Sequence, residues 1–314
     1  MKRILVTGAG GFVGTHLLRS LLTQADVEIF AAVYKSTSNI SQLLDARHII
    51  EGDLTDANFT QELIKTTNPA VIYHLAALSV VQDSDTHALG IMASNTAISY
   101  HLLESMRTLA PQARLIAIGS ANAYGLVDPA NLPIKESAPL RPLNPYAISK
   151  ITQEMLALQY ALTHNLDIVL LRPFNHTGAG QTNNFVIPAL VQQIVAAERG
   201  EKSEIVVGNL HTSRDFTDVR DMVKAYILAA EKCQSGEIYN IGSGTGHSIQ
   251  DIIDTLRSLT ARPFTVKTSE QRARHGDVPV LIADATKFAT LTGWKPEIPF
   301  TSTLQAILDY WRSQ

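Results

Sequence analysis

Short apolar runs alternate with longer segments of helical periodicity through the first half of the chain. The runs have the length of buried strands and lie at residues 4–6, 27–33, 49–50, 70–77, 114–119 and 167–171. Between them, apolar residues recur at the spacing of one helix face over residues 13–22, 59–66, 91–109 and 145–163. This alternation predicts an α/β fold, a doubly wound parallel sheet covered by helices on both faces. In such sheets ligands bind beyond the carboxyl ends of the strands.

The alternation loosens after residue 175. Helical segments are expected at 188–197, 219–230, 247–259, 284–291 and 301–310, and short strands at 204–207 and 237–241. We therefore expect residues 1–175 to form the cofactor-binding sheet domain, joined by a return segment at about 217–243. Residues 176–314 are expected to form a smaller C-terminal α/β lobe that binds the substrate.

Composition and charge mainly exclude classes of partner and structure. The 314 residues are 45% hydrophobic and 18% charged with a net charge of −3, which gives no reason to expect nucleic acid or an anionic membrane as partner. No apolar run approaches the roughly 18 residues of a membrane span. Cys233 is the single cysteine, so an internal disulfide is impossible. With a strand starting at the N-terminus and no secretion signal, a cytoplasmic location is expected.

Three glycines follow the first apolar run with the spacing Gly8-x-x-Gly11-x-x-Gly14. A strand, a glycine turn and a helix aim backbone N–H groups at a pyrophosphate, as in the Rossmann fold. Gly8 permits the tight turn, Gly11 lets the phosphates approach, and Gly14 lets the helix lie close to the strand. The spacing departs from G-x-G-x-x-G, so a structural turn in another α/β protein is the alternative for this stretch alone.

A candidate catalytic group lies between residues 119 and 150. Ser120 closes an apolar strand, and Tyr146 and Lys150 share one face of a helix that opens at Asn144-Pro145. An ammonium about 4 Å from the phenol contributes up to ~4 kcal/mol at an effective dielectric constant of ~20. At ~1.4 kcal/mol per unit, the pKa of Tyr146 is expected to fall by two or three units. Ser120 would hold a carbonyl oxygen while Tyr146 gives or takes its proton.

Four motifs together resemble the extended short-chain dehydrogenase/reductases that act on nucleotide sugars. They are Thr7-Gly8-Ala9-Gly10-Gly11-Phe12-Val13-Gly14, His74-Leu75-Ala76-Ala77, Tyr146-x-x-x-Lys150 and Arg172-Pro173-Phe174-Asn175. The stretches 172–181 and 208–221, with Gly293-Trp294-Lys295-Pro296, are similar to the GDP-4-keto-6-deoxy-mannose reductases and the neighbouring GDP-mannose 4,6-dehydratases. The likeness extends over essentially the whole chain.

The resemblance implies roles by position. Ser120, Tyr146 and Lys150 match the catalytic residues, and Tyr146 and Lys150 also contact the cofactor. By position, Phe12 and Val13 match contacts to the cofactor pyrophosphate, and Asp53 and Leu54 match contacts to its adenine. Leu75, Ala76 and Ala77 match the wall beside the cofactor. Substrate contacts match Asn175, Arg214 and Arg274 at the diphosphate and Asp277 at the ribose hydroxyls. Guanidinium groups suit diphosphates because they donate paired hydrogen bonds.

Two departures from the relatives refine this interpretation. Dehydratase relatives carry one or two carboxylates just after the catalytic Ser/Thr, whereas this chain has Ser120-Ala121-Asn122-Ala123. Water elimination needs such a group, so its absence argues against dehydration. The second apolar strand ends without the acid that holds a ribose 2′-OH, and Lys35 and Ser36 stand where a 2′-phosphate would lie. NADP(H) is therefore favoured, although NAD(H) is possible.

The combined hypothesis is NADP(H)-dependent reduction of the C4 keto group of a GDP-linked 4-keto-6-deoxy hexose. The product would be GDP-rhamnose or its C4 epimer. A GDP-mannose 4,6-dehydratase, a nucleotide-sugar 4-epimerase and an NADP-sensing scaffold without catalysis are the alternatives. The ten histidines show no clustered ligand spacing, so no metal site is expected. The helical segments 91–109 and 145–163 could pair across a two-fold axis, and a homodimer is expected.

Overall fold

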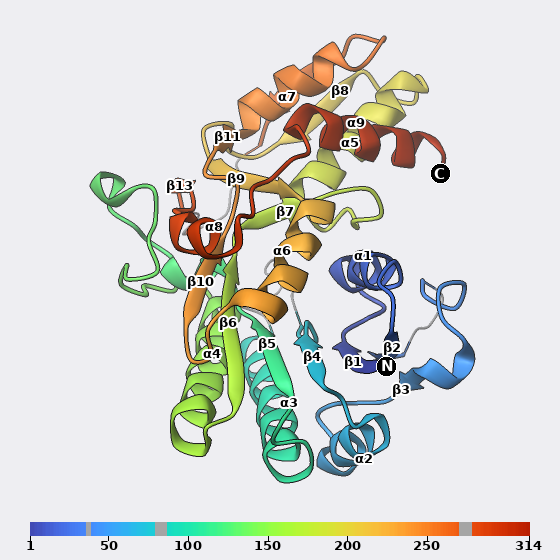
Figure 1. Ribbon diagram of the computed structural model, residues 1–314. Coiled ribbons are helices and arrows are strands. Elements are labelled where there is room, and N and C mark those ends of the chain that lie inside the picture. Colours follow the sequence, from blue (N-terminus) through green and yellow to red (C-terminus); the bar gives the residue numbers. More distant parts are fainter. Residues whose placement is uncertain (36–38, 79–86, 270–277) are drawn as a thin grey trace.

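The computed structural model describes residues 1–35, 39–78, 87–269 and 278–314. Within these residues, seven parallel strands form the central sheet in the order β10-β6-β5-β4-β1-β2-β3 (Figure 1). They are β1 (Lys2–Thr7), β2 (Val27–Val33), β3 (Ile49–Glu51), β4 (Val71–His74), β5 (Arg114–Ile118), β6 (Asp167–Pro173) and β10 (Ile238–Ile241). The order reverses between β1 and β4, so the ends of these two strands border the crevice where such sheets bind ligands.

Both faces of the sheet are covered. Ile4 and Val6 of β1 are buried beneath one helix layer, whereas Leu5 between them is buried beneath the other. The first layer contains α1 (Phe12–Leu21), α6 (Val219–Lys232) and α8 (Thr286–Thr292), and the second contains α2 (Ala57–Thr67), α3 (Ala88–Leu109) and α4 (Pro145–His164). Burial on both sides explains why the strands appear as continuous apolar runs. The predicted doubly wound α/β fold is confirmed.

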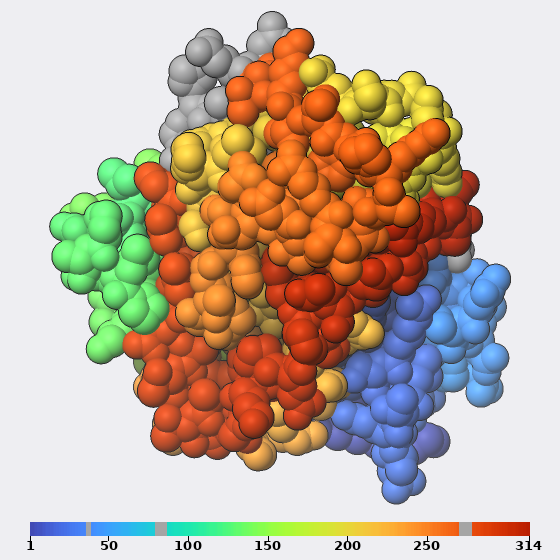
Figure 2. Space-filling model, turned by 90° about the horizontal axis from the view of Figure 1, so that it is seen from above, coloured from blue at the N-terminus to red at the C-terminus, as the bar shows by residue number. Residues whose placement is uncertain are grey.

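A second lobe lies beyond the carboxyl ends of the central strands (Figure 1). Its helices α5 (Val186–Glu198), α7 (Ile249–Ser258) and α9 (Phe300–Arg312) share a separate apolar core. Its short strands are β7 (Asn175–Thr177), β8 (Glu204–Val207), β9 (Ser213–Asp218), β11 (Gly246–Ser248), β12 (Thr265–Thr268) and β13 (Val280–Leu281). Seen from above, this yellow-to-red lobe covers much of the molecule (Figure 2). The lobe therefore lies on the side of the sheet where parallel sheets bind their ligands.

Part of the segment expected in the second lobe contacts the central sheet. Helix α8 packs against α6 and against β10 of that sheet. Phe288 and Trp294 are buried in the core of that sheet. They meet edge to face at 5.7 Å between ring centroids. Part of the C-terminal region therefore stabilises the first domain.

No helix among the described residues is both long enough and apolar enough to cross a membrane.

Candidate functional site

The glycine turn between β1 and α1 is closely packed. A Cβ atom on Gly8 would lie 2.8 Å from the backbone nitrogen of Ala76, and Gly8 has a φ of +68°. A Cβ on Gly14 would lie 2.5 Å from the carbonyl oxygen of Gly8. Gly11 precedes the first residue of α1 as its N-cap, and no side chain in the described part of the chain caps this helix. The turn therefore presents first-turn amides and the positive end of the helix, which suits a pyrophosphate.

The wall beside this turn is attached to β1 through Thr7. The Thr7 Oγ1 and His74 Nδ1 atoms lie 2.8 Å apart. The Ala76 amide donates to the same hydroxyl at 3.3 Å, and the Leu75 amide donates to the Thr7 carbonyl at 3.3 Å. Leu75, Ala76 and Ala77 are all partly exposed. The structure thus brings the glycine turn and the predicted cofactor wall together.

The residues expected at the adenosine end lie after β2 and β3. Lys35 is exposed in a left-handed conformation, and its Nζ lies 4.7 Å from the ring centroid of Tyr34. Ser36 lies outside the described residues. The Asp53 carboxylate accepts from the amide and the hydroxyl of Thr55, both at 2.8 Å, while Leu54 is buried. Asp53 therefore stabilises its own turn, and its adenine contact remains a prediction.

Ser120, Tyr146 and Lys150 lie at the carboxyl end of β5 and on the first turns of α4. Asn144 caps α4 by accepting from the Ala147 amide at 2.8 Å. The side chains of Ser120 and Tyr146 lie close enough for Ser120 to lower the pKa of the Tyr146 phenol. The Asn122 amide donates to Ser120 Oγ at 3.2 Å. Because that oxygen already accepts a hydrogen bond, its own proton is available to a second oxygen.

The electrostatics of the pair differ from the expectation. Burial raises the pKa of Tyr146 to about 12, and the neighbouring Ser120 side chain only partly opposes this rise. Burial also lowers the pKa of Lys150 to about 7, so this amine is only partly charged at neutral pH. The expected lowering of the Tyr146 pKa by Lys150 is therefore wrong for the protein by itself. Loss of hydration on burial is the main cause of both pKa shifts.

Asn95 of α3 is a site residue that sequence reasoning missed. Its Oδ1 accepts from the Leu78 amide at 2.8 Å, and its Nδ2 donates to Ser149 Oγ at 2.9 Å. Ser149 in turn donates to the Tyr146 carbonyl at 2.8 Å. This chain of bonds connects the segment after β4 to the catalytic helix. A lone Asn in a helical pattern carries no sequence signal for such a role.

A buried ion pair holds α4 against β6. Arg172 donates to both carboxylate oxygens of Glu154, at 2.8 and 2.5 Å, and both side chains are almost fully buried. The same guanidinium donates at 2.9 Å to the hydroxyl of Tyr124, in the turn after Ser120. Tyr124 donates onward to Asn240 at 2.7 Å. Arg172 thereby links the Ser120 turn with the helix that carries Tyr146 and Lys150.

Two of the residues predicted to bind substrate, Asn175 and Arg214, lie within the described part of the chain. Asn175 is exposed at the start of β7, which directly follows β6. It pairs with Phe216 of β9, and Arg214 lies two residues before Phe216. The Arg214 guanidinium donates to the Ser213 carbonyl at 2.8 Å. Arg274 and Asp277 lie outside the described residues, so their expected contacts remain predictions.

Known proteins resemble the chain over its full length. A family model described as GDP-mannose 4,6 dehydratase matches residues 5–307. The chain is 32% identical to GDP-6-deoxy-D-mannose reductase of Pseudomonas aeruginosa over 100% of its own length and 98% of that protein. It is 30% identical to GDP-6-deoxy-D-talose 4-dehydrogenase of Aggregatibacter actinomycetemcomitans, over 98% of this chain and 96% of the relative.

A solved structure agrees with these matches. The structure of RMD from Pseudomonas aeruginosa complexed with NADPH superposes with a TM-score of 0.89 at 30% identity, covering 100% of this chain and 99% of the other. The glycine turn and the Ser120, Tyr146 and Lys150 arrangement lie on this shared fold. The chain is therefore an enzyme of the GDP-mannose 4,6-dehydratase family, within the extended short-chain dehydrogenase/reductases.

Proposed function

We propose that the protein reduces the C4 keto group of a GDP-4-keto-6-deoxy hexose with NADP(H), converting GDP-4-dehydro-6-deoxy-D-mannose to GDP-D-rhamnose. The observation that carries this proposal is that Ser120 lies beside Tyr146, with Lys150 one turn along α4 and the neutral Asn122 after Ser120. Removing a proton from C5 requires a base, and the turn Ala121–Tyr124 contains no carboxylate. The names of the two curated relatives support the same substrate class.

The protonation state of Tyr146 favours reduction. With a pKa raised to about 12, its phenol holds its proton at neutral pH and acts as a donor rather than a base. Ser120 donates to the C4 carbonyl oxygen, and Tyr146 transfers its proton to that oxygen as negative charge develops there. The Lys150 ammonium stabilises the resulting phenolate until solvent returns a proton. The chemistry that a reduced nicotinamide would supply here, once held by the glycine turn, is a hydride for C4.

The cofactor proposal is supported by the chain's own residues. The glycine turn and the uncapped α1 would hold the pyrophosphate, and a Cβ at Gly8 would close the gap to Ala76. Lys35 offers a cation after β2, where NAD-selective sites use an acid. The relative whose structure matches was solved with NADPH. These observations favour NADP(H) over NAD(H).

The substrate would lie between the sheet and the second lobe. Asn175 and Arg214 come from adjacent strands β7 and β9 just beyond the end of β6. We infer that they contact the diphosphate of the GDP-sugar, together with Arg274, and that Asp277 accepts from its ribose. We infer that residues 1–175 with 217–243 form the cofactor domain, against which α8 packs.

Turnover with a defined keto sugar tests the proposal. Purified protein is given GDP-4-keto-6-deoxy-mannose with NADPH or NADH, absorbance is followed at 340 nm, and the sugar is identified by NMR. Oxidation of NADPH with formation of a GDP-6-deoxyhexose is expected. No turnover with either coenzyme would contradict the reductase assignment.

Parallel reactions separate the alternatives. Loss of water from GDP-mannose would indicate a dehydratase, and conversion of UDP-glucose without net coenzyme oxidation would indicate a 4-epimerase. A protein that binds NADPH without consuming it would be a sensor.

We also propose a homodimer formed through α3 and α4. Large apolar side chains are exposed on these helices at Tyr100 and Leu109 of α3 and at Ile148, Met155 and Leu162 of α4. Residues 148, 155 and 162 are seven apart, so they lie along one stripe of α4. Exposed apolar stripes of this kind mark interfaces. Sedimentation equilibrium should give twice the mass of the chain, and Met155→Glu should give a monomer.

A further inference from the structure

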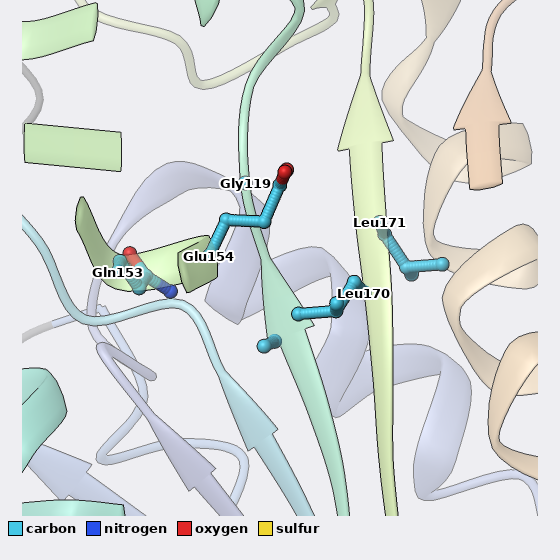
Figure 3. A pocket seen from close by; sticks show the side chains of 6 residues that line it. Gly119, Gln153, Glu154, Leu170 and Leu171 are labelled. Carbon is cyan, nitrogen blue, oxygen red and sulfur yellow. The ribbon is translucent and has the colours of Figure 1, made fainter. Parts of the chain in front are cut away.

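Gln153 lies one turn after Lys150 on α4 and is 2% exposed. Its Oε1 accepts a hydrogen bond from Lys150 Nζ at 2.7 Å. Its Nε2 donates to the carbonyl oxygen of Ile118 at 3.4 Å. Ile118 ends β5, two residues before Ser120. Figure 3 shows Gln153 and Glu154 of α4 beside the end of this strand at Gly119. A single amide therefore connects the Lys150 amine to the strand that carries Ser120.

The bond to Ile118 determines which end of the amide Lys150 meets. An amide has one accepting and one donating end, and a carbonyl can only accept. With Nε2 committed to Ile118, Oε1 is the end that faces the amine. In the reverse orientation, the Gln153 NH₂ group would face the Lys150 amine, so that donor meets donor. Gln153 Oε1 would face the Ile118 carbonyl oxygen, so that acceptor meets acceptor. The strand end thus selects the orientation that favours a positive charge on Lys150.

Within the described part of the chain, the other groups around Lys150 supply no countercharge. From β4, His74 lies close enough for the amine to lower its pKa, and burial keeps its imidazole neutral. From α4, Tyr146 holds its proton, and Glu154 is bonded through both oxygens to Arg172 of β6. From α3, Asn95 is neutral and bonded to Ser149. Among the described residues, Gln153 is the hydrogen-bond acceptor that Lys150 uses.

We propose that Gln153 is a positioning residue that holds Lys150 as an ammonium ion within reach of Tyr146. Its catalytic consequence rests on the proposed function, whereas the hydrogen bond itself does not. A neutral acceptor stabilises the ammonium without cancelling its field. A carboxylate at the same place would keep the charge on Lys150 but neutralise it toward the phenol, so an amide serves the reaction better than either an apolar or an acidic side chain.

The charge of Lys150 can be titrated directly. Lysine labelled with ¹³C at Cε is incorporated, the signal of Lys150 is assigned by its absence in Lys150→Met, and its midpoint is followed from pH 5 to pH 10. Loss of a hydrogen bond to a charged group should lower the midpoint by about one pH unit in Gln153→Met. The carboxylate in Gln153→Glu should raise it. Gln305→Met serves as control, because this amide on α9 bonds Asp309 at 2.8 Å, far from α4 along the chain.

The pH dependence of turnover tests the catalytic consequence. In Gln153→Met, the alkaline limb of the kcat–pH profile should move to lower pH than in the parent. The KM for the sugar should stay unchanged. In Gln153→Glu the alkaline limb should move to higher pH while the maximal kcat falls. A merely structural role would scale the whole profile without moving it, and would overturn the proposal.

The two readouts fail independently. If the parent protein reduces no keto sugar, the proposed function fails while the titration still measures the Gln153–Lys150 bond. If the Lys150 midpoint is the same in the parent and in Gln153→Glu, the positioning role is refuted whatever the turnover. Circular dichroism checks that each variant folds. If Gln153→Met does not fold, the comparison of Gln153→Glu with the parent still tests the proposal.

Discussion

Replacing Lys150 by methionine should make the protein more stable while it stops the reaction. The amine is 4% exposed, and burial lowers its pKa from 10.5 to about 7. Keeping the charged form in the fold at pH 7 therefore costs roughly 4 kcal/mol, at about 1.4 kcal/mol per pKa unit. Methionine fills a similar volume without this cost, but it leaves the Gln153 carbonyl unpaired, at about 1–2 kcal/mol. We expect Lys150→Met to gain about 2–3 kcal/mol in the free energy of unfolding at pH 7.

The sign of the pH dependence follows from the lowered pKa. Between pH 10 and pH 7 the unfolded chain binds a proton at Lys150 that the folded chain does not bind. The parent therefore loses stability as the pH falls through this window, and the variant does not. The gain in free energy of unfolding of Lys150→Met over the parent should be absent near pH 10. It should grow as the pH falls to about 7 and stay constant below pH 7.

Urea denaturation of both proteins at pH 9.5, 8 and 7 measures this difference. Lys65→Met is the matched control, because Lys65 is exposed on α2 and lies 3.7 Å from Glu62. Its stability should stay within about 0.5 kcal/mol of the parent at each pH. A Lys150→Met variant that is less stable than the parent at pH 7, or that differs from it equally at pH 9.5 and 7, would refute the reasoning.

Three further changes test the site. Tyr146→Phe should lower kcat by roughly 100- to 10,000-fold while NADPH, followed by fluorescence, still binds; undiminished turnover would remove Tyr146 from the mechanism. Glu154→Gln leaves the buried Arg172 guanidinium without a carboxylate, so urea unfolding should show a loss of about 3–5 kcal/mol, and an unaltered midpoint would contradict the importance of the pair. Lys35→Met should weaken NADPH binding about tenfold in calorimetry and leave NADH binding nearly unchanged; equal losses for both would exclude a 2′-phosphate contact.

The pattern of apolar residues was sufficient for the central sheet and its long helices. The segment expected to be helical over 145–163 is α4, Pro145–His164, and the strand expected at 27–33 is β2, Val27–Val33. Parallel strands buried on both faces must be apolar throughout, and covering helices must be apolar every three or four residues, so each is visible locally. The glycine turn could also be predicted from the sequence, because its conformation depends on residues that are adjacent in the chain.

The strand expected at 204–207 is β8, Glu204–Val207, but most short strands of the second lobe could not be predicted in this way. β9, Ser213–Asp218, is largely polar, yet it is central to a small sheet because β7, β11 and β13 pair with it from distant parts of the chain. Strands of two or three residues carry no periodicity, and their existence depends on partners brought together by folding.

The candidate site shows the same division. A serine at a strand end and a Tyr-x-x-x-Lys on a helix were enough to place Ser120, Tyr146 and Lys150 at one edge of the sheet. The direction of their pKa shifts depends on how deeply the side chains are buried, and no local sequence pattern predicts that depth. Gln153 and Asn95 were equally hidden, because a neutral amide in a helix carries no signal until folding brings a particular amine or hydroxyl within 3 Å of it. The sequence by itself determined which elements form and which groups end at the sheet edge, whereas desolvation and hydrogen-bond partners belong to the tertiary structure, since both depend on atoms far apart along the chain.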